Sequence, residues 1–275
     1  MIGPSELARE FWERGKSESC PIYDMHGHMG LESPIYFPRA ETADMIRTMD
    51  ECGVRMLTFC HHVALNAPEL GNRLNIEAVH RYPDRLRAYC AINPNYPEII
   101  ERDLASFAEH RDVFVGLKFL SDYQRIALTD PRCRPAWEYA DAHGLLVLCH
   151  TWSRSPYDGP EAVREIAERY PHIKLLLGHS LHDDWDAAIA MARDFPHVYL
   201  ELTAVFDDCG ALEKLCAGAG SDRMLFGTDL PWFDPHQAVG ALLSADISDE
   251  DRHNICHRNA ERLLAPFLGR GDGGN

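Results

Sequence analysis

Eight short apolar runs recur at fairly even intervals along this chain of 275 residues. Segments with the 3.6-residue periodicity of amphipathic helices lie between them. Nearly continuous apolar runs are typical of parallel strands that are covered on both faces. The expected strands are 21–26, 54–60, 86–92, 113–119, 145–150, 173–179, 198–202 and 224–228. The expected helices are 68–82, 96–110, 132–143, 160–170, 183–195, 210–219, 235–244 and 249–268.

The alternation of strands with helices predicts an α/β fold, a single (β/α)8 TIM barrel over residues 1–268. Thr129-Asp130-Pro131 suits a helix start, and His143-Gly144 suits a helix end before the fifth strand. An open doubly wound sheet is the alternative, but no Gly-x-Gly-x-x-Gly follows the first strand. The glycine-rich residues 269–275 are expected to form a disordered tail.

The charge balance argues against nucleic acid and anionic membranes as partners. The net charge is −16, and lysine and arginine form no cluster that would bind phosphates. The N-terminal segment lacks the apolar core of a signal peptide, and no run is long enough to span a membrane. None of the nine cysteines forms a Cys-x-x-Cys pair, so we expect free thiols in a cytoplasmic protein. A homodimer is compatible with the sequence.

Polar residues gather at the C-terminal ends of four expected strands, where a barrel carries its active site. These residues are His26, His28, His150, His179 and Asp229. The two histidines of the first strand are two residues apart, so their side chains share one side of the strand. Each residue alone could be structural, but a histidine in an apolar strand is costly to bury without a partner. Together they predict one divalent cation, most readily zinc, with manganese or iron as alternatives.

Other polar and aromatic residues follow the same strand ends. Lys118, Tyr123, Arg125, Trp152, Arg154 and Trp232 are expected to bind a small-molecule substrate. The two arginines suit a carboxylate, although solvated loop charges are an equal alternative. We expect His61, His62, Asn93 and His182 nearby, and Glu201 could orient a metal ligand or pair with Lys118. The remaining histidines lie before strands or in helices and receive no role.

Five motifs taken in order resemble the amidohydrolase superfamily. They are Asp24-Met25-His26-Gly27-His28, Gly116-Leu117-Lys118-Phe119, Cys149-His150-Thr151, Leu177-Gly178-His179-Ser180 and Phe226-Gly227-Thr228-Asp229-Leu230-Pro231. The resemblance runs from about Cys20 to Asn259-Ala260-Glu261-Arg262-Leu263-Leu264. Within the superfamily, the motifs more specifically resemble the amidohydrolase-related branch that contains aminocarboxymuconate-semialdehyde decarboxylase and several lactonases.

The resemblance implies a role for each matching residue. His26, His28 and His150 would be metal ligands, and His179 would bind the metal or orient its water. Asp229 would be both a ligand and the proton-transfer group. Lys118 matches a lysine that is carbamylated and bridges two metals in binuclear members, but we favour one metal and an unmodified lysine.

Two enzymatic functions and one binding function remain open. The leading hypothesis is hydrolysis of a small, carboxylated lactone, ester or amide by a metal-activated water, with Asp229 as the base. The first alternative is a metal-dependent decarboxylase, which is a lyase, on the same scaffold. The second is a barrel that binds a ligand without turnover. A deaminase is less well supported, since nothing marks a nucleobase site.

Overall fold

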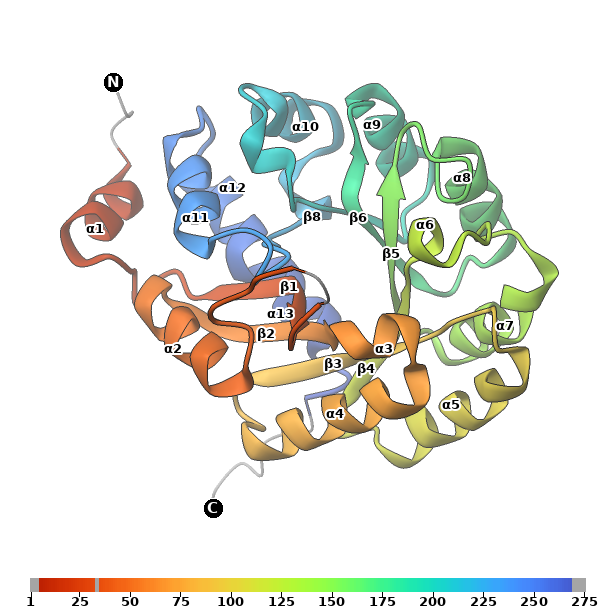
Figure 1. The fold of residues 1–275 in the computed structure, drawn as a ribbon. Coiled ribbons are helices and arrows are strands. Elements are labelled where there is room, and N and C mark those ends of the chain that lie inside the picture. Colours follow the sequence, from red (N-terminus) through yellow and green to blue (C-terminus); the bar gives the residue numbers. More distant parts are fainter. Residues whose placement is uncertain (1–4, 33–34, 269–275) are drawn as a thin grey trace, which may run out of the picture.

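The strands form the predicted barrel in this computed structural model, which describes residues 5–32 and 35–268. All neighbouring strands are parallel, in the order β1 to β8 (Figure 1). Their bounds are β1 Ile22–Met29, β2 Val54–His61, β3 Leu86–Ala91, β4 Phe114–Phe119, β5 Leu146–Trp152, β6 Lys174–His182, β7 Val198–Glu201 and β8 Met224–Leu225. Parallel strands place all their C-terminal ends at one end of the barrel, so the predicted site residues share one rim.

The helices lie around the outside of the ring of strands (Figure 1). The α-helices are α1 Glu6–Arg14, α2 Thr42–Cys52, α3 His62–Asn66, α4 Pro68–Arg81, α5 Pro97–Glu109, α6 Ser121–Gln124, α7 Arg134–His143, α8 Pro160–Arg169, α9 Trp185–Asp194, α10 Ala211–Ala219, α11 Pro235–Ser244, α12 Asp249–His253 and α13 Asn259–Leu264. Short 3₁₀ helices cover Pro131–Cys133, Val205–Asp207 and Ser221–Arg223.

The helix predictions need two corrections. Helices α1, α2, α3 and α6 were not among the ranges expected from the sequence. The predicted helix 249–268 is instead three consecutive segments, because a π-helical segment, Asn254–Arg258, separates α12 from α13. Its last regular turn ends at Leu264. The predicted tail 269–275 lies outside the described residues.

The barrel closes between β1 and β8 through few contacts. One isolated bridge joins Gly27 to Leu230, and the Met25 amide donates to the Phe226 carbonyl at 2.9 Å. Strand β8 is shorter than the predicted 224–228 because the side chain of Asp24 accepts hydrogen bonds from the Thr228 amide and hydroxyl. Backbone hydrogen bonds to β1 continue beyond β8, because the Asp229 amide donates to the His26 carbonyl at 2.7 Å and the His28 amide donates to the Leu230 carbonyl at 2.6 Å.

The apolar core has two layers. A large cluster between strands and helices includes Trp137 and Phe119, whose rings stack at 4.5 Å between centroids. A smaller cluster, which includes Met25, Tyr89 and Leu148, fills the interior of the barrel. Filled interiors are usual for this fold and make the barrel a rigid support for residues at its rim. Within the described residues, no helix combines the length and the apolar character needed to cross a membrane.

Candidate metal centre

His26 and His28 lie near the C-terminal end of β1, and both side chains are buried. Their ring centroids are 5.3 Å apart. The Nδ1 atom of His26 is 2.7 Å from Glu201 Oε2, and that of His28 is 2.8 Å from the Cys60 carbonyl oxygen. Because an ionised carboxylate and a carbonyl can only accept, each Nδ1 carries the hydrogen. Both Nε2 atoms therefore carry a lone pair, as metal-binding imidazoles do, and Lys118 Nζ lies 3.0 Å from that of His26.

Asp229 meets these two lone pairs just after β8. Its Oδ1 atom is 3.4 Å from His26 Nε2 and 3.2 Å from His28 Nε2. Three electron-rich atoms at such distances repel one another unless a proton or a cation lies among them. Zinc takes nitrogen and oxygen ligands at about 2.0–2.2 Å, which places neighbouring ligands roughly 3.0–3.5 Å apart. The donor set and its spacing therefore fit a divalent cation.

His179 and His150 extend this group from β6 and β5. Ligand atoms of His26, His179 and Asp229 all lie within 4.8 Å of one another. The Nδ1 atom of His179 is buried and has no hydrogen-bond partner among the described residues. The ring of His150 is 4.8 Å from that of His179, and its Nδ1 donates to buried Asp158 at 3.1 Å. All five predicted ligands line one cavity, and we call them the mouth cluster. Within it, His150 lies close to Asp122 and Asp158, while His26, His179 and Asp229 form the most compact group.

Backbone strain accompanies this arrangement. His179 and Asp229 have φ angles of 65° and 58°, in the left-handed region that residues other than glycine rarely adopt. The His179 amide donates to Glu201 at 3.2 Å, and the Asp229 amide donates to the His26 carbonyl at 2.7 Å. Such strain persists where surrounding contacts over-determine the conformation, and it concentrates at functional sites.

Glu201 supports the cluster from β7. It is fully buried and also accepts a hydrogen bond from the Thr203 hydroxyl at 2.6 Å. Burial raises the pKa of Glu201 to about 7. A β-carbon on Gly227 would lie 1.8 Å from Glu201 Oε1, so only glycine leaves room for this carboxylate. The orienting role suggested for Glu201 agrees with its contact to His26.

Lys118 brings an amino group to the same point from β4. The side chain is 1% exposed, and its Nζ is 3.0 Å from His26 Nε2. Burial lowers the pKa of this amine. Lys118 therefore faces the mouth cluster, as its sequence position predicts, and contacts a ligand atom directly.

A cavity of about 190 Å³ opens above the mouth cluster. Four of the six predicted substrate-binding residues line it, namely Lys118, Tyr123, Trp152 and Trp232. Arg125 and Arg154 do not line it in the described part of the chain. Both are exposed, and Arg154 pairs with Asp183 at 2.7 Å. Their loops carry them outward, so the predicted arginine clamp is not assembled in this structure.

Aromatic side chains form firm walls. Trp232 Nε1 donates to His62 Nε2 at 2.9 Å, and His62 Nδ1 donates to the Gly30 carbonyl at 2.7 Å. Phe37 stacks on the same imidazole at 5.4 Å between centroids. On the other side, Trp152 stacks on His182 at 4.4 Å. These contacts hold the rings against one another around the cavity.

Two other residues predicted near the rim, His61 and Asn93, form hydrogen bonds with backbone groups instead of lining the cavity. The Val63 amide donates to His61 Nδ1 at the start of α3, and Asn93 donates to the carbonyls of Leu65 and Asn66. Asp158, which supports His150, was not predicted from the sequence. Asp158 lies in a turn-forming Tyr-Asp-Gly segment, a signal that predicts a loop but no contact.

The sequence model of the Amidohydrolase family matches residues 23–265. This chain belongs to the amidohydrolase family. The match covers almost the whole barrel, so the resemblance expected from the motifs is confirmed, and this amidohydrolase is an enzyme of that superfamily.

One relative is the gamma-resorcylate decarboxylase of Polaromonas sp. strain JS666, 24% identical over 285 residues. That alignment covers 80% of this amidohydrolase and 86% of the relative.

Two solved structures share the fold. A dihydroxybenzoic acid decarboxylase from Polaromonas sp. JS666, with bound manganese and the inhibitor 2-nitroresorcinol, has a TM-score of 0.72 and 19% identity. The match covers 92% of this chain and 98% of that one. A 5-carboxyvanillate decarboxylase from Novosphingobium aromaticivorans, complexed with manganese and 4-hydroxy-3-methoxy-5-nitrobenzoic acid, has a TM-score of 0.71 and 16% identity. There the match covers 90% of this chain and 96% of the other.

Proposed function

We propose that this amidohydrolase is a divalent-metal-dependent decarboxylase of a small aromatic acid that carries a hydroxyl group. The observation that carries the proposal is the mouth cluster at the floor of an aromatic-walled cavity. The decarboxylase relatives support the same reaction, two of them with manganese and nitro-substituted phenols. The sequence-based preference for hydrolysis is less well supported than its decarboxylase alternative.

The mouth cluster would hold one cation, with His26, His28, His150, His179 and Asp229 as its ligands. Glu201 and Asp158 would fix the orientation of His26 and His150. Nitrogen and carboxylate ligands suit manganese, iron and zinc alike. Manganese has the support of the relatives.

The size of the cavity suits one aromatic ring. A cavity of about 150 Å³ is enough to bind benzene in another protein, and this one measures about 190 Å³. Trp152, Trp232 and Phe233 offer flat apolar surface to such a ring. Lys118, together with the cation, would attract the carboxylate and the neighbouring hydroxyl to the floor.

A bound cation would supply positive charge that binds the carboxylate and the hydroxyl and makes phenolate formation easier. Asp229 would take the hydroxyl proton at a carboxylate oxygen and deliver it to the ring carbon that bears the carboxylate. The bond from that carbon to the carboxylate then breaks, its electron pair restores the aromatic ring, and carbon dioxide leaves. Proton uptake from water regenerates the phenol.

The test is a substrate panel on manganese-loaded enzyme. It contains 2,6-dihydroxybenzoate, 5-carboxyvanillate and simple carboxylated lactones and esters, and carbon dioxide and acid release are measured separately. We expect carbon dioxide and the decarboxylated phenol from a hydroxybenzoate, with no turnover after chelation. Acid release from lactones without carbon dioxide would establish hydrolysis instead.

We also propose that the mouth cluster binds one cation and that Lys118 is unmodified. Anomalous scattering from crystals of the manganese-loaded enzyme should give one peak between His28 and Asp229. Two peaks joined by density extending from Lys118 would instead establish a binuclear centre with a carbamylated lysine.

A further inference from the structure

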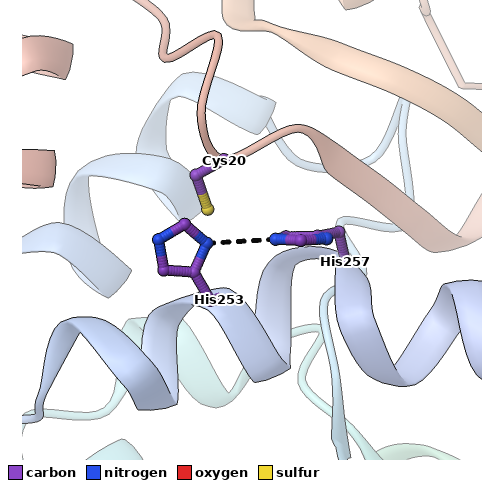
Figure 2. A group of neighbouring side chains, drawn as sticks. All are labelled: Cys20, His253 and His257. Atoms are coloured by element: carbon purple, nitrogen blue, oxygen red, sulfur yellow. Dashed lines mark hydrogen bonds between the residues drawn. The ribbon is translucent and has the colours of Figure 1, made fainter.

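A second group of metal-binding residues lies away from the mouth cluster. Cys20 precedes β1, whereas His253 and His257 lie at the end of α12 and in the π-helical segment that follows. Figure 2 shows the Cys20 thiol pointing toward the two imidazole rings. One ligand atom from each residue lies within 4.8 Å of the other two. We call these three residues the base cluster, because Cys20 lies at the N-terminal end of β1.

The distances within the base cluster are close to those of a metal site. His253 Nδ1 is 3.0 Å from His257 Nε2 (Figure 2). Two imidazole nitrogens on one tetrahedral zinc, each at about 2.0–2.1 Å, are roughly 3.3 Å apart. A shift of a few tenths of an ångström would admit the ion in place of the proton between these rings. The Cys20 thiol would lose its proton to solvent on binding, as thiol ligands do.

One histidine of the base cluster already has the supporting carboxylate of a metal ligand. His257 Nδ1 lies 3.1 Å from Glu261 Oε2 and donates to it. Its Nε2 lone pair therefore faces His253 and the cluster. The same arrangement holds His26 through Glu201 in the mouth cluster.

The surroundings give the base cluster a fixed backbone and a path for an ion. Cys20 is fully buried, and its amide donates to Ser17 Oγ at 3.1 Å. His257 is 13% exposed at its side chain, so an ion can enter from solvent. The histidines flank or lie in a π-helical segment, and such segments are frequent at functional sites.

We propose that Cys20, His253 and His257 form a second, thiolate-containing site for zinc. Thiolate with imidazole selects zinc or cobalt over manganese and magnesium. The π-helical segment that carries His257 contacts both β1 and β8, so a bound ion would tie the N-terminal segment to the barrel where it closes. Three protein ligands leave the fourth position to water, and the ion should exchange with solvent.

Cobalt absorption tests this site separately from the mouth cluster, whose ligands contain no sulfur. Metal-free enzyme is titrated with cobalt, and the near-ultraviolet charge-transfer band of a cobalt–thiolate bond is recorded. We expect the band to reach its maximum by two equivalents, since the mouth cluster takes up the other, in the wild type and in Cys209→Ser, which removes an exposed thiol. We expect it to be absent in Cys20→Ser and His257→Gln.

A wild type without the band, or a band that persists in folded Cys20→Ser, would overturn the proposal. Circular dichroism checks the fold of each variant. If Cys20→Ser does not fold, His253→Gln provides the same readout, since this side chain is only partly buried. Zinc added to manganese-saturated enzyme should raise the melting temperature of the wild type and not that of the variants. The manganese-supported kcat should be equal in all of them.

Discussion

The two histidine clusters are built alike and placed differently. In each, a glutamate accepts a hydrogen bond from one imidazole, at 2.7 Å for His26 and 3.1 Å for His257, and leaves its second nitrogen free. The mouth cluster forms the floor of a cavity of about 190 Å³ inside the rim of the barrel. The base cluster lies between the N-terminal segment and the last helices (Figure 2).

The comparison of the two clusters separates the features required for metal binding from those required for substrate turnover. Both clusters have donor atoms with a supporting carboxylate, which are features that metal sites share. Only the mouth cluster adds an acidic proton carrier, Asp229, and aromatic walls around an open space. We therefore expect substitutions in the mouth cluster to change turnover and those in the base cluster to change metal-dependent stability.

The largest effect is expected for Asp229→Asn. The amide cannot carry the proton to the substrate, so kcat should fall by about 10²–10⁴-fold, the usual contribution of a general acid or base. Manganese binding should be lost only in part, because four histidines remain. Steady-state kinetics and metal analysis check this, with the cobalt–thiolate band unchanged. Near-wild-type kcat would remove Asp229 from the proposed mechanism.

A smaller effect is expected when the supporting glutamates are changed as a matched pair. Glu201→Gln should weaken manganese binding by about 10–100-fold, since outer carboxylates typically have this effect on metal affinity. Glu261→Gln should weaken zinc at the base cluster and leave kcat unchanged. Competition with a chelator gives both dissociation constants. Equal losses of kcat in the two variants would contradict the assignment of turnover to the mouth cluster and of metal-dependent stability to the base cluster.

The smallest effect is expected for Trp232→Phe. The change removes the donor to His62 and keeps most of the aromatic wall. The loss of this hydrogen bond within the cavity wall should cost roughly 1 kcal/mol of stability, its usual net value, and KM should rise because the wall is held less firmly. Trp12→Phe is the control, because Trp12 is 63% exposed. A large fall in kcat would mean that Trp232 takes part in the reaction itself.

Local pattern was enough to predict the barrel and the mouth cluster. Alternating apolar runs and helices indicate parallel strands, and parallel strands in a closed barrel end at one rim. His26, His150 and Asp229 come from distant parts of the chain, yet their positions at strand ends place them together. These residues come together because the geometry of the fold converts a position along a strand into a position in space.

No comparable rule predicts the contacts between loops and helices, so only the tertiary structure decides them. Asp158 reaches His150 from a loop, and Arg125 and Arg154 are exposed and do not line the cavity that their strand-end positions suggested. Cys20 meets His253 only because the last helices pack across the closure of the barrel. Periodicity along the sequence reports which face of a helix is buried, but not which distant residue lies opposite it.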